Sequence, residues 1–394
     1  MNKILFITNR NILTSCGELR LIKNRTEMLY KCGDVQTDFI VMNSIDRFTS
    51  KQREKIENIG EIVECAYKSK YFFMKSVKKA QSAMIKKIDE EKYSTVILSG
   101  ALTYKFAEII KSKYPNINVI LDIHGASEDM LEIAKNSNGV KRYALKFLYN
   151  YESKALGNAT KYCDGLLVVT DELKNYLISK YAVIKDKKFY RIPCAYSQNL
   201  FTQDEYNTYR NQYREKYGIK DELVFVYSGG TSTWQCIEES IDLYKQIDES
   251  LNRKTKMLIF SYNAEQLKSL INNDSRFSID SYEPNELGKA LCASDFAFLL
   301  RKKSLTNKVA FPNKFLEYVA GGMKIITTPY VTEIAKQVEK FNCGYIYDFK
   351  FDQSIINYIE NVEPSYDQGL IQEVLDFNSY ERCLKELIEL INSN

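Results

Sequence analysis

The sequence contains a single histidine and no two cysteines at CxxC spacing. These are the ligand patterns on which most protein zinc sites are built, so a zinc site of that kind is excluded. Nine cysteines are scattered through the 394 residues, and we interpret them as buried, reduced thiols of a cytosolic protein. The tandem carboxylates at 89–91 are typical of a helix surface, and we predict that no metal is required.

Long apolar runs and long basic runs are also missing. The run near the beginning, Ile4 to Ile7, has four residues, which is too short for a signal sequence or a membrane span. No other run approaches the roughly 20 apolar residues of a spanning helix. The net charge of +4 is small, which argues against a nucleic-acid partner. We expect a cytoplasmic protein, either soluble or peripheral at the inner face of the cell membrane.

What is present is a repeating pattern of short apolar runs and helical segments. The composition, with 45% hydrophobic and 27% charged residues, is that of a folded protein, and the length favours two domains. In the first half, five apolar, β-branched runs each precede a segment with helical spacing: 3–8, 37–42, 94–99, 118–123 and 165–170. Such alternation predicts a parallel sheet that is covered on both faces.

The pattern breaks at 191–206 and then starts again. The second series of predicted strands is 222–230, 256–261, 276–280, 295–301, 323–328 and 343–348. We therefore predict an α/β protein with two Rossmann-like parallel-sheet lobes and an inter-lobe cleft. The predicted divisions are an N-terminal lobe at 1–195, a linker at 196–221, a C-terminal lobe at 222–378, and a helix at 379–394 that packs back on the N-terminal lobe.

One short segment, FPNKFLEYVAGG at 311–322, concentrates residues that suit a phosphorylated ligand. Arg301 ends the preceding strand, and we expect Asn313 to cap a helix on which Lys314 and Glu317 share one face. Two cations at a helix N-terminus suit a diphosphate, and the glutamate can accept hydrogen bonds from a ribose. The alternative is an ion pair between Lys314 and Glu317 on a solvated helix.

Three segments extend this pattern over residues 222–348. They are VYSGGTSTWQCIEESIDLY, Y..NEL...L..SDFAFLLR and N.VAFPNKFLEYVAGGMKIITT. In this order and spacing they resemble retaining glycosyltransferases of family 4, which have the GT-B fold, and more narrowly bacterial members that build capsular, lipopolysaccharide or other surface glycans. The resemblance implies sugar transfer from a UDP- or GDP-linked donor to a glycan or lipid-linked acceptor, without a metal or other cofactor. It is looser over the first lobe, which takes the acceptor.

The resemblance also assigns residues of the second lobe to the donor. It implies that Arg301 and Lys314 hold the diphosphate and assist catalysis, and that Glu317 holds the ribose. The other residues assigned to the donor are Gly229, Gly230, Tyr282, Pro312 and Asn313. Tyr282 is expected to stack near the base, with simple packing as the alternative. The chain departs from the family at two places. Val309 stands where many members carry a second glutamate. The chain also lacks the Arg and Lys that many members carry after the first strand of this lobe, and we expect Arg301 to supply the missing positive charge.

Two residues of the first lobe complete the predicted site. His124 follows the strand at 118–123 and precedes Gly125, and the family places such a histidine near the donor sugar. The implied role is a hydrogen bond to a sugar hydroxyl, with Asp122 as a supporting partner. Gly17 follows the first strand, in a loop that the family uses near the acceptor and sugar phosphate. A structural histidine and an ordinary turn glycine are the alternatives.

Basic and aromatic residues are interleaved at 70–88 and 139–154. As amphipathic helices these segments are suited to an anionic membrane, where lipid-linked acceptors lie, although solvated helix faces are the alternative. Three other functions remain open: a sugar-nucleotide 2-epimerase of the same fold, a non-catalytic nucleotide-sugar-binding partner, and a glycogen-type phosphorylase or synthase. The single histidine argues against the epimerase, and Val309 keeps the binding partner open.

Overall fold

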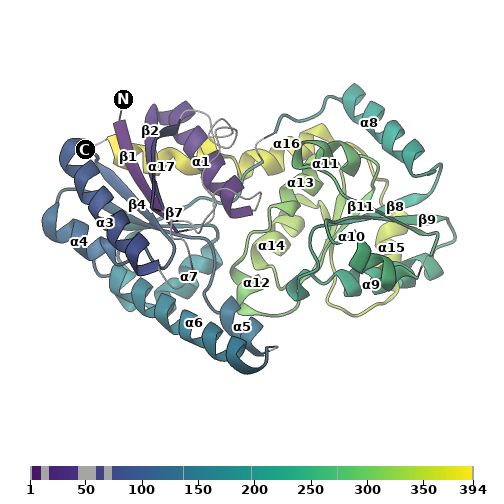
Figure 1. Cartoon of the computed structure of the whole chain (residues 1–394). Coiled ribbons are helices and arrows are strands. Elements are labelled where there is room, and N and C mark those ends of the chain that lie inside the picture. Colours follow the sequence, from purple (N-terminus) through teal and green to yellow (C-terminus); the bar gives the residue numbers. More distant parts are fainter. Residues whose placement is uncertain are drawn as a thin grey trace. The chain divides into compact units, whose positions relative to one another are not determined.

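The computed structural model describes residues 2–9, 17–42, 59–65, 73–135, 137–196, 198–272 and 274–392. The chain divides into two compact units, Met1–Ala195 with Ser379–Asn394, and Tyr196–Asn378. Each unit contains one parallel sheet covered by helices (Figure 1). The predicted fold class, an α/β protein with two Rossmann-like parallel sheets, is therefore confirmed.

The sheet of the first unit has seven strands in the order β3-β2-β1-β4-β5-β6-β7. Their bounds are β1 Asn2–Thr8, β2 Val35–Val41, β3 Ile59–Glu64, β4 Thr95–Ser99, β5 Asn118–Ile123, β6 Gly165–Val168 and β7 Lys188–Arg191. The five predicted strands are the five central ones, which are buried on both faces. The sequence analysis missed β3 and β7, the two edge strands.

Helices cover both faces of this sheet. On one face lie α3 (Phe73–Glu90), α4 (Phe106–Lys113), α6 (Gly139–Ala159) and α7 (Asp171–Lys180), with the short helices α5 (Asp129–Lys135) and η2 (Ala182–Ile184) in the same unit. On the other face α1 (Gly17–Gly33) packs beside the C-terminal helix α17 (Tyr380–Asn392). Leu384, Leu387 and Ile391 of α17 share one apolar core with Ile22 and Leu29 of α1.

The sheet of the second unit has six strands in the order β10-β9-β8-β11-β12-β13. Their bounds are β8 Leu223–Ser228, β9 Thr255–Phe260, β10 Phe277–Asp280, β11 Phe296–Leu299, β12 Lys324–Thr327 and β13 Gly344–Ile346. The helices of this unit are α8 (Gln203–Lys216), η3 (Thr233–Gln235), α9 (Ile237–Ser250), α10 (Ala264–Ile271), α11 (Pro284–Leu291), α12 (Leu305–Val309), α13 (Lys314–Ala320), α14 (Thr332–Phe341), α15 (Gln353–Asn361) and α16 (Gln368–Phe377). Each predicted strand of this half is present.

The segment 196–221, for which the sequence suggested a linker, belongs to the second unit and contains α8. A capping box begins this helix: the backbone N–H of Glu205 donates to the Thr202 hydroxyl at 3.2 Å, and the Glu205 carboxylate accepts from the backbone N–H of Thr202 at 2.8 Å. The hydroxyl of Tyr213 donates to Glu286 of α11 at 3.0 Å. This segment is therefore folded against the lobe that it precedes.

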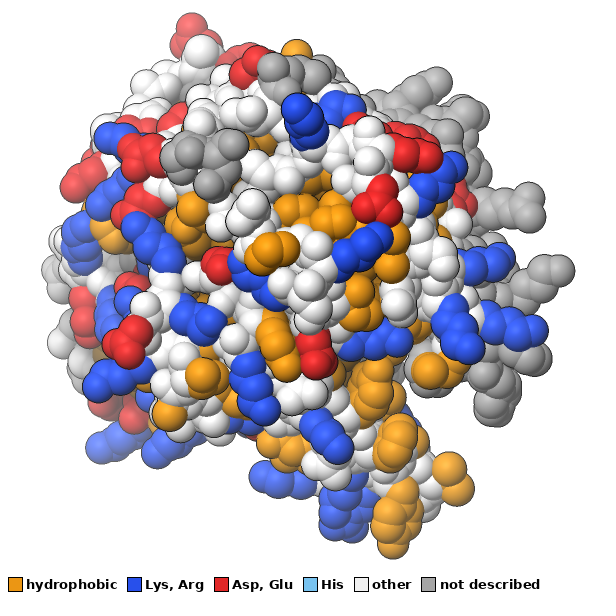
Figure 2. All heavy atoms as spheres, turned by 90° about the vertical axis from the view of Figure 1, so that its left-hand side faces the viewer, with side chains coloured by type: hydrophobic (Ala, Val, Ile, Leu, Met, Phe, Trp, Pro, Cys, Tyr) orange, Lys and Arg blue, Asp and Glu red, His pale blue; other side chains and the backbone are white. Residues whose placement is uncertain are grey.

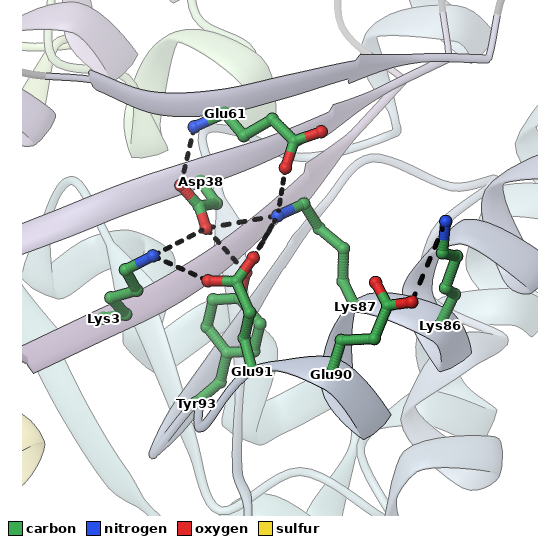
Figure 3. Close-up of polar contacts among 8 residues, drawn as sticks. All are labelled: Lys3, Asp38, Glu61, Lys86, Lys87, Glu90, Glu91 and Tyr93. Carbon is green, nitrogen blue, oxygen red and sulfur yellow. Dashed lines mark hydrogen bonds and ion pairs between the residues drawn. The ribbon is translucent and has the colours of Figure 1, made fainter.

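A cluster of charged residues around the buried Lys87 and Asp38 connects α3 to strands β1 and β2 (Figure 3). The amine of Lys87 lies 3.4 Å from Oδ2 of Asp38 and 2.8 Å from Oε1 of Glu91. The Tyr93 hydroxyl donates to Oδ2 of Asp38 at 2.6 Å, and Nζ of Lys3 lies 2.6 Å from Glu91. The side chains of Lys87 and Asp38 are only 6% and 1% exposed, so the pairing compensates charges that water cannot reach. We interpret the cluster as structural.

In both sheets the strand order reverses once, between β1 and β4 and between β8 and β11. In open α/β sheets, ligands bind beyond the carboxyl ends of the strands at such a reversal. The loops after these strands are therefore where a ligand site is expected in each unit.

Candidate functional site

Two cations lie next to the reversal point of the second sheet. Arg301 is two residues past β11 and only 7% exposed, and Lys314 is the partly buried first residue of α13. Burial, and after it the charge of Arg301, lowers the pKa of Lys314 to about 7, and the opposing influence of Glu317 is smaller. Burial also lowers the pKa of Arg301. Within the described ranges, neither side chain forms an ion pair with a carboxylate. A buried and a partly buried cation that lack an ion-pair partner in the described part of the chain form a site suited to an anion.

Gln235, the last residue of η3, connects the two cations. Nζ of Lys314 donates to its Oε1 at 2.5 Å, and Nη1 of Arg301 donates to its backbone carbonyl at 3.3 Å. Nζ of Lys314 also lies 4.9 Å from the centre of the Tyr227 ring, and the Tyr227 hydroxyl donates to the carbonyl of Gly230 at 2.6 Å. The sequence analysis missed Gln235 and Tyr227, although both lie in the segment VYSGGTSTWQ that carries the resemblance.

The Gly229–Gly230 turn after β8 lies directly beside Lys314. Gly229 has a φ of +136°, and a β-carbon added to it would be 1.7 Å from Nζ of Lys314. Its backbone N–H donates to the carbonyl of Phe260 at 2.8 Å, which fixes the turn to β9. A side chain at this position would occupy the space of the amine, so glycine is required for the approach. The structure thus brings together Gly229, Gly230, Arg301 and Lys314.

Helix α13 is more buried than the solvated helix that the sequence left as an alternative. Five of its seven residues are buried: Phe315, Leu316, Tyr318, Val319 and Ala320. Lys314 and Glu317 are its two partly exposed residues, and the hydrogen bond of the Lys314 amine goes to Gln235. The predicted cap is wrong: Asn313 occupies the N-cap position, but it has helical angles of −54° and −32° and its side chain makes no capping bond. The carbonyl of Pro312 instead accepts the N–H of Phe315 at 3.1 Å.

Tyr282 has the packing role that the sequence left as an alternative. It is 9% exposed, and its ring meets the edges of Tyr213 and Phe260 at 5.7 and 5.2 Å between centroids. Its hydroxyl accepts from Nζ of Lys216 at 2.7 Å and bonds to the hydroxyl of Tyr217. The ring therefore joins α8 to β9, and its contact with a base stays a prediction.

In the first unit, His124 lies just beyond the end of β5 and is held by a buried carboxylate. Its Nε2 is 2.7 Å from Oδ2 of Asp122, and Oδ1 of Asp122 accepts from Nη1 of Arg25 at 2.6 Å. Arg25 in turn donates to the carbonyl of Ile192 at 2.6 Å. Burial alone would raise the pKa of Asp122, but the charges of His124 and Arg25 outweigh it and hold that pKa below its usual range. The sequence analysis had not included Arg25.

The second ring nitrogen of His124, Nδ1, is not used by this carboxylate. Nδ1 is buried and has no hydrogen-bond partner among the described residues. Beside it, a β-carbon added to Gly125 would meet nothing within 4 Å. Because Asp122 fixes the ring, Nδ1 points in a defined direction. Gly17, also in this unit, is the first residue of α1, and the preceding loop at 10–16 lies outside the described residues.

The described residues contain no group of three or more His, Cys, Asp or Glu side chains placed to hold a metal ion. Val309, the residue at which the chain departs from the resemblance, ends α12 and is 1% exposed. Of the helices in the described ranges, none has both the length and the apolar content needed to cross a membrane.

Solved structures share this architecture over essentially the whole chain. Sucrose-phosphate synthase from Thermosynechococcus elongatus has a TM-score of 0.71 at 13% identity, with 100% of this chain and 99% of that chain covered. A glycosyltransferase from Rickettsia africae has a TM-score of 0.67 at 14% identity, with 100% and 98% covered. WaaG, a glycosyltransferase involved in lipopolysaccharide biosynthesis, has a TM-score of 0.63 at 15% identity, with 99% and 100% covered.

By contrast, no protein-family model matches the sequence, and no curated protein matches it either. The structural likeness shows that the chain has the GT-B fold of these glycosyltransferases.

Proposed function

We propose that this protein is a glycosyltransferase that moves a sugar from a nucleotide-sugar donor to an acceptor. The observation that carries the proposal is the pair of cations, the buried Arg301 and the partly buried Lys314, beside the Gly229 turn at the reversal point of the second sheet. Two cations beside a glycine turn suit the diphosphate of such a donor. The shared fold with proteins described as glycosyltransferases supports the same assignment.

The chemistry requires stabilisation of the diphosphate as it departs. Arg301 and Lys314 meet the charge that grows on the leaving group, so they lower the barrier to bond breaking. Glu317, one turn along α13 from Lys314, accepts hydrogen bonds from the ribose of a UDP- or GDP-linked donor. A hydrogen bond from His124 to a sugar hydroxyl orients the sugar for attack by the acceptor hydroxyl.

We further propose the retaining, family 4 type of transfer in bacterial surface-polysaccharide synthesis, at the inner face of the cell membrane. The leaving phosphate takes the proton of the acceptor hydroxyl on the face from which it departs, so neither a carboxylate nucleophile nor a metal is needed. The resemblance over residues 222–348 supports this part of the proposal. The acceptor is a glycan or a lipid-linked glycan.

The decisive experiment is incubation of the full chain with a panel of UDP-, GDP- and TDP-sugars, with slow hydrolysis as the readout. We expect hydrolysis of at least one donor, and loss of turnover in Arg301→Ala and Lys314→Ala that exceeds their loss of donor affinity. Glu317→Ala should weaken nucleotide binding and transfer together. Binding without turnover for every donor would instead indicate the non-catalytic partner, for which Val309 is the supporting observation.

The proposed retention of anomeric configuration is tested by a separate measurement. With the donor identified, the anomeric configuration of the product can be followed by NMR during the first turnovers. Retention would support the family 4 mechanism. Inversion would overturn the proposed mechanism, although the protein would still be a glycosyltransferase.

A further inference from the structure

Helix α6 carries an unusual share of the exposed apolar surface. Ten large hydrophobic side chains are exposed in the described part of the chain, and five of them lie on this one helix. They are Val140, Tyr143, Phe147, Leu148 and Tyr151, and the first three are 85%, 75% and 70% exposed. Single exposed apolar residues are ordinary, but a contiguous group on one element marks an interaction surface.

These five residues form one stripe. At 100° per residue, Val140, Phe147 and Tyr151 fall within about 40° of one another, and Tyr143 and Leu148 flank them. The opposite side of the helix faces the protein, where Leu156 is buried and the hydroxyl of Tyr149 donates to Glu128 at 3.1 Å. Helix α6 therefore has two apolar sides, of which the fold covers one. We call the uncovered side the α6 ridge.

Basic residues lie along α6, and at 100° per residue two of them, Lys141 and Lys154, fall beside or within the α6 ridge. The helix carries four exposed basic residues: Lys141, Arg142, Lys146 and Lys154. Over the described residues, none of the four forms an ion pair, and the only acidic residue of the helix, Glu152, accepts a hydrogen bond from Ser127 at 3.1 Å. Figure 2 shows apolar and basic side chains gathered at its lower edge, the level at which α6 lies in Figure 1. Apolar side chains among unpaired cations complement an anionic lipid surface.

We propose that the α6 ridge is a membrane-docking surface that inserts Val140, Tyr143 and Phe147 among anionic lipid headgroups while Lys141 and Lys154 bind the lipid phosphates. A second basic helix of the same unit, α3, presents the exposed Lys78 and Lys79 on the same side of the first sheet, so it adds long-range attraction. The inference deepens the membrane location of the proposed function, but it does not depend on sugar transfer.

The test is co-sedimentation of the full chain with vesicles of phosphatidylcholine, with and without phosphatidylglycerol. We expect binding only when phosphatidylglycerol is present, and weaker binding as salt shortens the Debye length from about 10 Å at 0.1 M to about 3 Å at 1 M. Phe147→Ser should lower the partition coefficient about tenfold, and Lys154→Ala about fivefold. Val183→Ser is the matched control, because Val183 is 54% exposed in the same unit and lies outside α6.

A spectroscopic readout distinguishes insertion from surface attraction. In Phe147→Trp, the emission of the new tryptophan should shift to the blue on addition of anionic vesicles, while Trp234, which lies in the second unit, provides the unchanged background. Absent binding, or equal binding by wild type and Phe147→Ser, would overturn the proposal. A dimer in solution that Phe147→Ser dissociates would show that the ridge meets a second copy instead. Donor hydrolysis without vesicles reports on the proposed function separately.

Discussion

A β-carbon on Gly229 would lie 1.7 Å from the amine of Lys314. Gly229→Ala should therefore displace this amine and weaken nucleoside-diphosphate binding by about tenfold, the effect of losing one charge-assisted hydrogen bond. The positive φ of +136° adds backbone strain, for which we expect about 1–3 kcal/mol of lost stability. Isothermal titration with UDP and GDP, beside thermal unfolding, measures both effects.

The matched control is Gly218→Ala. Gly218 also has a positive φ, +63°, but a β-carbon there would meet nothing within 4 Å. This variant should lose stability to a similar extent and keep its nucleotide affinity. Equal loss of affinity in both variants would mean that strain in the fold, and not the position of Lys314, controls binding.

The second prediction concerns pH. The pKa of Lys314 is lowered to about 7 in the free protein, and a bound diphosphate would favour the protonated amine and raise that pKa again. Affinity for a nucleotide-sugar should then be greatest below pH 7 and fall by up to tenfold per pH unit as pH rises above it. Binding at pH 7 should take up about half a proton, measurable by calorimetry in buffers of different ionisation enthalpy. Lys314→Arg should remove the proton uptake, and an unchanged uptake would exclude Lys314 as its source.

The third prediction concerns Gln235. Its side-chain oxygen accepts a hydrogen bond from Lys314, and its backbone oxygen accepts one from Arg301. Gln235→Glu places a carboxylate where the amide accepts from Lys314, so the site would neutralise its own charge. We expect diphosphate affinity to fall by about tenfold or more, while the melting temperature rises because the buried amine gains a counter-ion. Gln235→Met, which removes the tether without adding charge, serves as the comparison. Tighter binding by Gln235→Glu would contradict an anion site at Lys314.

The central strands of both sheets could be predicted because burial on two faces demands a continuous apolar run, as in LFIT at 5–8 or LLV at 166–168. The edge strands β3 and β7 could not, since IGEIVE and KFYR contain charged residues that interrupt the apolar run and that one open side tolerates. Their pairing is set by neighbouring strands, which no local pattern reveals.

Proximity within the candidate site was harder to foresee. Arg301, after β11, could be named from its place at the end of a strand, and Gly229 and Gly230, after β8, from the resemblance. Gln235 and Arg25 could not, because their roles depend on contacts across 79 and 97 residues of sequence. The cap at Asn313 failed for a local reason: a side-chain cap needs extended backbone, and this residue has helical angles.

The fourth prediction tests the buried cluster around α3. Lys87→Met removes a charge that lies 3.4 Å from Asp38, whose side chain is 1% exposed, and leaves that carboxylate with weaker partners. We expect about 3 kcal/mol of lost stability in chemical denaturation, near the low end for breaking a buried pair, because Tyr93 still donates to Asp38. Lys86→Met is the control, since Lys86 is 73% exposed in an i,i+4 pair with Glu90 and should change stability by less than about 0.5 kcal/mol. If Lys87→Met and Lys86→Met lost similar amounts of stability, burial of the ion pair would not determine how much it contributes.

The last prediction concerns His124, whose Nδ1 has no partner among the described residues and whose Nε2 is held by Asp122. His124→Ala should leave the binding of free nucleoside diphosphate nearly unchanged, because we assign those contacts to the second unit. Transfer should fall on the order of 10²-fold, as expected for the loss of one positioned hydrogen-bonding group. The fold of His124→Ala should survive, since Asp122 keeps its ion pair with Arg25 at 2.6 Å. The comparison variant is Asp122→Asn, which removes the counter-charge of the buried Arg25 guanidinium and should clearly lower the melting temperature. Melting temperature, nucleotide affinity and turnover measured on one preparation separate these cases. If His124→Ala loses stability as Asp122→Asn does but keeps its turnover per folded molecule, then His124 serves the fold and not the chemistry.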